Sequence, residues 1–199
     1  MPDYLEPYAR AAARHGAGFG SLLWASPSTQ EARFQAFTRA ADFNRRSILD
    51  VGCGRGDLLE YLLARHIVPA LYVGLEAIDS LASAAEARRL PNSMIIRADF
   101  VREPQRMFVA ADLVVISGAL NTLGPNDFYQ TIRRAFDAAA EMLLFNFLDS
   151  PQLAGASYLS WHSPQQVLAF CRSIAPQVRE ISGYLDGDRT MVLTHDRPH

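Results

Sequence analysis

Three alternating glycines, Gly52, Gly54 and Gly56, come directly after a short apolar run and directly before a segment with a helical pattern, residues 57–65. Glycine lacks a side chain and tolerates positive φ, so these positions let the backbone turn sharply or lie close against a ligand. A helix that begins here aims its first free N–H groups into the turn. The pattern predicts a ligand-binding turn between a strand and a helix.

Two carboxylates flank this turn, Asp50 at the end of the apolar run and Asp57 at the start of the helical segment. A dinucleotide-binding fingerprint reads G-x-G-x-x-G and seats a pyrophosphate on the helix N-terminus, whereas this chain reads G-x-G-x-G. Carboxylates at this point oppose a pyrophosphate and favour a ligand with a cationic group. S-adenosylmethionine, which carries a sulfonium, an ammonium and no phosphate, suits such a turn.

The elements that must position these residues follow from the hydrophobic pattern. From Ser47 onward, short apolar segments alternate with helical ones. Strands that are apolar at consecutive positions fit a parallel sheet that is covered on both faces. The expected strands are 48–51, 71–75, 94–96, 113–116 and 142–147, and the expected helices are 57–65, 78–89 and 127–139.

The N-terminal segment, residues 1–46, is predicted to be helical. An Ala-rich stretch from Tyr4 to Arg14 is followed by a glycine-rich break, and the capping box Ser28-Thr-Gln-Glu31 opens a second helix that runs through Phe43. We expect this segment to form a cap or lid on the domain.

The C-terminal segment, residues 149–199, is predicted to hold a long loop at 149–160, a helix and a β-hairpin. Ser163-Pro-Gln-Gln166 caps a helix through Ile174, and the strands 178–185 and 190–194 flank a tight turn at 186–188. The sheet should therefore gain an antiparallel edge pair.

Composition limits the classes of function. The 199 residues are 49% hydrophobic, which is enough for one domain spanning 1–199, with its cofactor-binding core at 47–148. The net charge of −2 and pI near 6.2 disfavour a nucleic-acid partner, and no stretch approaches the ~20 apolar residues of a membrane span. All basic residues are Arg, which excludes Schiff-base chemistry. Cys53 and Cys171 have no metal-ligand spacing, so we expect no metal and a reducing cytoplasm.

The segment Leu49-Asp50-Val-Gly52-Cys-Gly54-Arg-Gly56-Asp57 resembles the glycine-rich motif of class I S-adenosylmethionine-dependent methyltransferases. The resemblance covers roughly residues 47–195. It implies an α/β, three-layer, doubly wound Rossmann-like fold, with a mostly parallel seven-stranded sheet, an antiparallel C-terminal hairpin strand and, here, an N-terminal helical cap. It also implies S-adenosyl-L-methionine as cofactor and S-adenosyl-L-homocysteine as product.

The resemblance assigns cofactor-binding roles to three further strand ends. Tyr72-Val-Gly-Leu-Glu76 looks like the family's second strand, whose final acid takes both ribose hydroxyls, and Glu76 lies about twenty residues past the glycines, as expected of a ribose acceptor. Ala98-Asp99-Phe100 is similar to the adenine site, and Ile116–Asn121 to the wall at the methionine end. The implied cofactor-binding residues are Asp50, Gly52, Cys53, Gly54, Gly56, Glu76, Ala77, Asp99, Phe100, Ser117 and Gly118.

A narrower likeness points to a bacterial subgroup of methyltransferases with unassigned substrates. It rests on Ser117–Asn121, on Phe145-Asn146-Phe147-Leu148 and on Trp161-His162-Ser163-Pro164-Gln-Gln-Val167. The subgroup leaves the reaction open.

Residues on the acceptor side are less defined. His162 and His15 are candidate general bases because a neutral imidazole takes a proton near pH 7, although Trp161-His162 also fits a hydrophobic staple. Asn121 and Asn146 follow separate strands and either face the pocket or cap turns. Aromatic residues that either roof a cleft or pack in a core are Tyr4, Tyr8, Phe19, Trp24 and Tyr158.

Three functions follow as hypotheses. The first is methyl transfer by in-line displacement to a small-molecule acceptor. The second is a non-catalytic, S-adenosylmethionine-binding regulatory module, because no acid or base is secure. The third is a protein or RNA methyltransferase that uses the paired arginines at 45–46, 88–89 and 133–134, although such pairs are usually solvated. The acceptor atom and the oligomeric state stay open.

Overall fold

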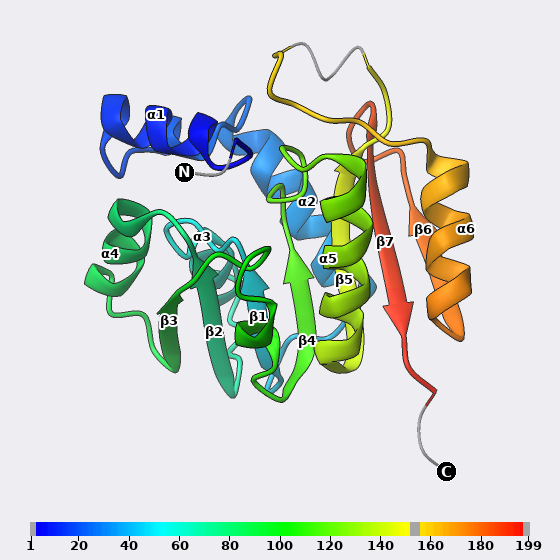
Figure 1. Cartoon of the computed structure of the whole chain (residues 1–199). Helices are drawn as coiled ribbons and strands as arrows, with labels where there is room; N and C mark the ends of the chain where they lie inside the picture. The colour runs from blue at the N-terminus through cyan, green and yellow to red at the C-terminus, as the bar shows by residue number, and fades with distance from the viewer. Residues whose placement is uncertain (1–2, 152–155, 197–199) are drawn as a thin grey trace.

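A computed structural model describes residues 3–151 and 156–196 and contains one seven-stranded sheet, with strand order β3-β2-β1-β4-β5-β7-β6 (Figure 1). The first five strands along the chain pair in parallel, and β7 lies antiparallel between β5 and β6. The predicted sheet is confirmed, including its antiparallel hairpin strand. The strands are β1 Ser47–Val51, β2 Leu71–Glu76, β3 Ser93–Arg97, β4 Ala111–Ile116, β5 Ala139–Leu148, β6 Gln177–Ile181 and β7 Asp188–Thr194.

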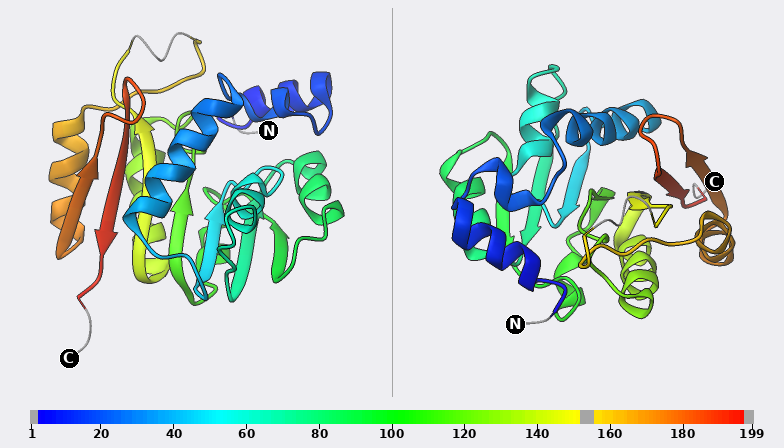
Figure 2. Two further views of the ribbon diagram at one scale, coloured as in Figure 1. Left: turned by 180° about the vertical axis from the view of Figure 1, so that it is seen from behind. Right: turned by 90° about the horizontal axis from the view of Figure 1, so that it is seen from above.

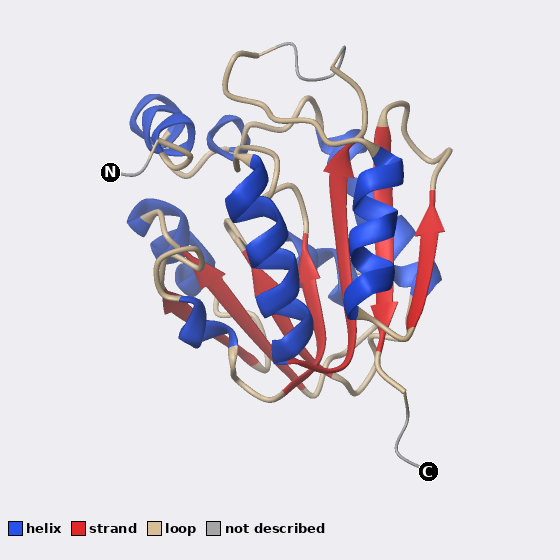
Figure 3. Cartoon of the chain, turned by 45° about the vertical axis from the view of Figure 1, so that its right-hand side comes forward, coloured by secondary structure: helices blue, strands red, loops and turns tan. Residues whose placement is uncertain are grey.

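Helices cover both faces of this sheet, as expected for strands that are apolar at consecutive positions (Figure 3). Helices α2 and α5 lie on opposite faces, which Figure 2 shows from behind and from above. The helices are α1 Glu6–His15, α2 Pro27–Ala40, α3 Asp57–Leu63, α4 Asp79–Ala87, α5 Pro125–Ala138 and α6 Pro164–Ile174, with short 3₁₀ turns η1 Phe19–Leu22 and η2 Pro104–Met107.

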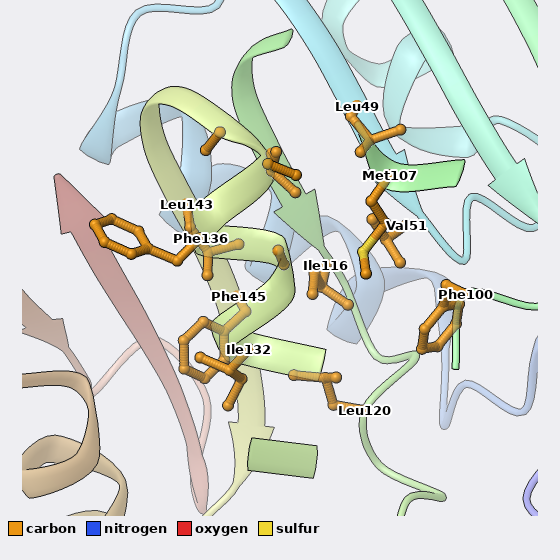
Figure 4. Packing of buried hydrophobic residues seen from close by; sticks show 14 of the residues in the cluster. Leu49, Val51, Phe100, Met107, Ile116, Leu120, Ile132, Phe136, Leu143 and Phe145 are labelled. Atoms are coloured by element: carbon orange, nitrogen blue, oxygen red, sulfur yellow. The ribbon is translucent and has the colours of Figure 1, made fainter. Parts of the chain in front are cut away.

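Alternate strand residues divide the core between the two faces. Leu49 and Val51 of β1 pack with Phe136 of α5 in one cluster, part of which Figure 4 shows. Ile48, the residue before Leu49, packs instead with Phe37 of α2 in the other cluster. Successive strand side chains point to opposite faces, so a continuous apolar run supplies both layers at once.

The second predicted helix has different bounds. Its capping box is formed by Ser26 and Thr29, not by Ser28 and Glu31: the Thr29 N–H donates to Ser26 Oγ at 3.2 Å, and the Ser26 N–H donates to Thr29 Oγ1 at 3.2 Å. Pro27 at the first helical position explains the earlier start, because its missing N–H needs no partner there. The helix ends at Ala40, three residues before Phe43.

The C-terminal segment also differs from its prediction. Strand β6 ends at Ile181 and Asp188 begins β7, so residues 182–187 form a longer connection in place of a tight turn at 186–188. Ser163 precedes α6, but its hydroxyl contacts Gln165 Oε1 and forms no backbone cap, so the predicted capping box is wrong. Of the loop expected at 149–160, residues 152–155 lie outside the described part of the chain.

The N-terminal helix α1 lies across the edge of the sheet at which β1, β2 and β4 end (Figure 1). Carboxyl ends of parallel strands meet at one edge, where α/β proteins bind ligands. Among residues 3–151 and 156–196, no helix has the length and apolar composition that crossing a membrane requires.

Candidate active site

The glycine turn after β1 needs glycine for conformation and for space. Gly52, Gly54 and Gly56 have φ values of 75°, 56° and 76°. A Cβ on Gly52 would lie 2.5 Å from the Cβ of Ala119, and one on Gly54 would lie 2.8 Å from Leu22 Cδ2. Such contacts exclude any larger residue without local movement, so the turn is closely covered by the β4 end and by the N-terminal segment.

A cavity of about 260 Å³ opens over this turn. Its floor is made by the ends of β1, β2 and β4, and its roof by residues 4–34. Nine of the proposed cofactor residues line it, namely Asp50, Gly52, Cys53, Gly54, Glu76, Ala77, Phe100, Ser117 and Gly118.

Glu76 connects two backbone segments at the cavity floor. One carboxylate oxygen accepts from the Gly54 N–H and the other from the Ile78 N–H, each at 2.8 Å. Burial raises the pKa of Glu76 to about 7, although the backbone donors at Ile78 and Gly54 favour its charged form. A buried carboxylate at a strand end is suited to accepting a pair of hydroxyl groups.

Asp50 is the second buried acid of the floor. Its carboxylate accepts from the Tyr72 hydroxyl. Burial raises the pKa of Asp50 to about 7; the Tyr72 hydrogen bond lowers it, and the Asp57 charge raises it further. A cationic ligand group near Asp50 would reverse this shift and hold the carboxylate ionised.

The end of β4 presents unsatisfied polar atoms to the cavity. Ser117 Oγ and Asn121 Oδ1 are buried, line the cavity and have no hydrogen-bond partner among the described residues. Buried polar atoms are normally paired, so a ligand or ordered water is expected here. Asn146 lies outside the cavity lining, and its Oδ1 accepts from the Gly118 N–H at 2.9 Å, which places it as a support for this loop.

Two proposed cofactor residues do not line the cavity. Gly56 is the N-cap residue of α3. Asp99 accepts from the Tyr4 hydroxyl, with oxygens at 2.8 and 2.7 Å, and from the Val101 N–H at 3.0 Å. The start of the N-terminal segment therefore occupies the carboxylate that we expected to meet adenine.

Neither candidate histidine lies on the cavity wall. His162 stacks on Phe128 with ring centroids 3.6 Å apart, and burial lowers its pKa to about 4. His15 lines a separate surface depression with Tyr158, between α1 and the 156–160 segment. The burial of His162 is explained by its packing against the Phe128 ring. Its position before a helix was the only sequence feature that suggested a general base.

The aromatic roof is partly as expected. Tyr4, Tyr8 and Trp24 line the cavity, whereas Phe19 and Tyr158 do not. The Tyr8 hydroxyl lies 3.5 Å from the Gly118 carbonyl oxygen, and burial raises the pKa of Tyr8. The N-terminal segment thus covers the floor residues with ring faces and separates them from solvent.

Sequence reasoning missed an ion pair at the far end of the cavity. Arg33 of α2 and Asp188 of β7 are both buried, both line the cavity and pair with each other. Arg33 also lies under Trp24, with its Cζ 4.5 Å from the ring centroid. One signal was available: Arg33 precedes Phe37 by four residues, so a helix places it on the apolar stripe.

The sequence from residue 48 to residue 141 matches a family model described as a methyltransferase domain. No protein of curated function matches the chain significantly.

Solved structures similar to this chain share its fold at low sequence identity. The magnesium protoporphyrin IX methyltransferase ChlM of Synechocystis PCC 6803, with bound SAH, has a TM-score of 0.68 and 13% identity over 98% of this chain and 97% of that one. DhpI in complex with SAH has a TM-score of 0.71 and 16% identity over 98% and 97%. The methyltransferase domain of a bacterial Hen1 has a TM-score of 0.64 and 16% identity over 82% and 98%.

Proposed function

We propose that this chain, an S-adenosylmethionine-dependent methyltransferase by its matched domain and its fold, transfers the methyl group to a small-molecule acceptor. The observation that carries the proposal is the roofed cavity over the glycine turn, because it encloses strand-end polar groups and has limited volume. Concave, largely enclosed sites with a few convergent polar groups are typical of small-molecule binding.

The lining residues fit the cofactor on three grounds. Gly52 and Gly54 form a cradle that a Cβ would fill, Glu76 offers a buried carboxylate to the ribose hydroxyls, and Ser117 Oγ lacks a partner. Asp50 would face the ammonium at the methionine end, with Gly118 beside it. Phe100 would form the apolar wall of the adenine subsite, with Asp99 behind Tyr4.

When bound, S-adenosylmethionine supplies a methyl group on a sulfonium, and the protein's part is to orient an acceptor and to exclude water. Tyr8 and Trp24 close the roof over the β4 end. Asn121 Oδ1 has no partner among the described residues, so it is free to accept a hydrogen bond from the molecule that receives the methyl group. Among the described lining residues none is a histidine, so we propose an acceptor that needs no imidazole base, such as an amine or a thiol.

Transfer is tested with methyl-labelled S-adenosylmethionine and a cell extract that is separated by molecular size after the reaction. Label in the small-molecule fraction, lost in Glu76→Ala, is the expected result. Label confined to protein or RNA would contradict the small-molecule acceptor. Tight cofactor binding with no label transferred would favour the regulatory alternative.

A protein or RNA substrate stays the second candidate because one structure of similar fold belongs to an RNA repair complex containing Hen1. In this chain, Arg88 is engaged by Asp57 and Glu60, and Arg46 by Glu141, which leaves less free positive charge for phosphates. RNA binding whose affinity falls steeply with salt would support this candidate.

A further inference from the structure

Arg33 is a buried cation on the wall of an otherwise acidic cavity. Its side chain is 7% exposed, and among the described residues that line the cavity it is the one basic side chain. A buried guanidinium is costly unless its donors are used. The carboxyl side chains that line the same cavity are Asp50, Asp57, Glu76, Asp186 and Asp188.

The donors of Arg33 are only partly used. Nε donates to Asp188 Oδ2 at 2.7 Å, and Nη2 donates to the same oxygen. The other oxygen of Asp188 accepts from the Tyr184 hydroxyl, so Asp188 is well paired. Among the described residues, Arg33 donates from Nε and Nη2 alone, and no hydrogen bond comes from its Nη1.

The free nitrogen lies beside the β4 end. A Cβ placed on Gly118 would be 3.4 Å from Arg33 Nη1 and 3.2 Å from Trp24 Cζ2. The Trp24 ring covers the guanidinium and shields it from solvent. A partly used guanidinium, held by one carboxylate and covered by an aromatic ring, is suited to donate a charge-assisted hydrogen bond to a second carboxylate.

We propose that Arg33 is the anion-binding residue of the cavity, and that its Nη1 donates to the carboxylate of a bound small molecule. Asp188 acts as the positioning residue that fixes the guanidinium. The proposal rests on the proposed function, because Gly118 is there assigned to the methionine end of the cofactor. The α-carboxylate of the cofactor is one source of the anion, and an acidic acceptor is the other.

Calorimetry with two ligands distinguishes these sources. S-adenosylhomocysteine carries the α-carboxylate, whereas 5′-methylthioadenosine has the same nucleoside and lacks the amino-acid part. The test variant is Arg33→Gln/Asp188→Asn, which removes the charge without leaving Asp188 buried and unpaired. Arg189→Gln is the matched control, because Arg189 pairs with Asp149 and Glu180 and does not line the cavity.

If the cofactor supplies the anion, the double variant should bind S-adenosylhomocysteine roughly tenfold or more weakly, as expected for the loss of a hydrogen bond to a charged group. Its affinity for 5′-methylthioadenosine should equal that of the parent protein, which also shows that the adenosine subsite is intact. The Arg189→Gln protein should bind both ligands as the parent does.

If the affinity for S-adenosylhomocysteine is unchanged, the loaded protein is titrated with benzoate and with benzamide. A preference of the parent for benzoate that disappears in the double variant assigns Arg33 to an acidic acceptor. The proposal is overturned if neither the ligand ratio nor the benzoate preference depends on Arg33. A parent protein that binds neither nucleoside overturns the proposed function, and this inference with it.

Discussion

Glu76 shows at the scale of one residue how burial and function are linked. Its two oxygens already accept from backbone N–H groups, and burial still keeps its pKa near 7. A carboxylate accepts from two hydroxyls, whereas a protonated carboxyl loses acceptor capacity. The ionised form is therefore the one that we expect to bind ribose.

Affinity for S-adenosylhomocysteine should rise as the pH increases from 6 to 8. Glu76, with a pKa of about 7, is mostly protonated at the lower pH, and ligand binding must then release a proton. Calorimetry in buffers of different ionisation enthalpy measures both the affinity and the proton released. Glu76→Gln should bind weakly with a flatter pH profile, and Glu86→Gln, whose exposed side chain pairs with Arg97, should keep the parent profile. A profile that is equally steep in Glu76→Gln would contradict this role.

The residues that the sequence correctly placed at the cavity are those whose location follows from local position. Glu76 ends β2 and Ser117 directly follows β4, and parallel strands end at one edge, so their convergence was predictable. Arg33, Trp24 and Asp188 meet only because α2 packs beside β7, and no local spacing encodes that packing. His162 has the chemistry of a base, but it packs on Phe128, which is a tertiary contact that the local sequence does not encode.

At the scale of elements, the glycine turn is the most constrained connection. Gly52→Ala should destabilise the protein by roughly 1–3 kcal/mol, because the new Cβ would meet the Ala119 Cβ in a backbone with φ of 75°. Gly183→Ala separates the two causes, since Gly183 has φ of 80° and open space around it. Urea unfolding gives both values. Equal losses at the two sites would show that the close contact with Ala119 adds nothing.

Tyr4, two residues before α1, provides a polar contact that holds the N-terminal segment over the cavity, because its hydroxyl donates to Asp99. In Tyr4→Phe, amide hydrogen exchange in α1 should accelerate about fivefold, the factor that corresponds to a hydrogen bond worth about 1 kcal/mol. Exchange in β1 and β4 should not change. Tyr129→Phe is the control, because its ring packs against Phe170 away from the cavity. Unchanged exchange in α1 would show that Tyr4 does not hold the helix.

Element types followed from the sequence more reliably than element ends. Apolar runs predicted the five parallel strands because a parallel strand covered on both faces must be apolar on both, and the hairpin pattern predicted β6 and β7. The end of β6 differs from its prediction because the Tyr184 hydroxyl donates to Asp188. The start of α2 differs because Ser26, followed by Pro27 at the first helical position, forms the N-cap two residues before Ser28. The exact bounds of these elements depend on side-chain hydrogen bonds, which the hydrophobic periodicity of the sequence does not predict.

At the scale of the whole molecule, the strand ends, the N-terminal segment and the Arg33–Asp188 ion pair enclose the same cavity. We therefore propose that residues 1–199 unfold as a single unit. Arg33 and Asp188 connect α2 to β7 across its far end, and α1 covers the near end. Calorimetric unfolding should show one transition. With S-adenosylhomocysteine at a hundred times its Kd, the free energy of unfolding should rise by about 2.7 kcal/mol, because the ligand binds only the folded state. Two separate transitions, only one of them sensitive to the ligand, would contradict a single unit.

We propose that the cavity over the glycine turn binds S-adenosylmethionine with Glu76 at its ribose. Titration calorimetry of the parent protein and of Glu76→Ala with S-adenosylmethionine measures this binding. We predict saturable one-to-one binding to the parent and an affinity at least about tenfold weaker in the variant, since a buried charged acceptor is lost. No binding heat with the parent protein would show that the cavity does not bind the cofactor, and the same affinity in Glu76→Ala would show that Glu76 does not bind the ribose.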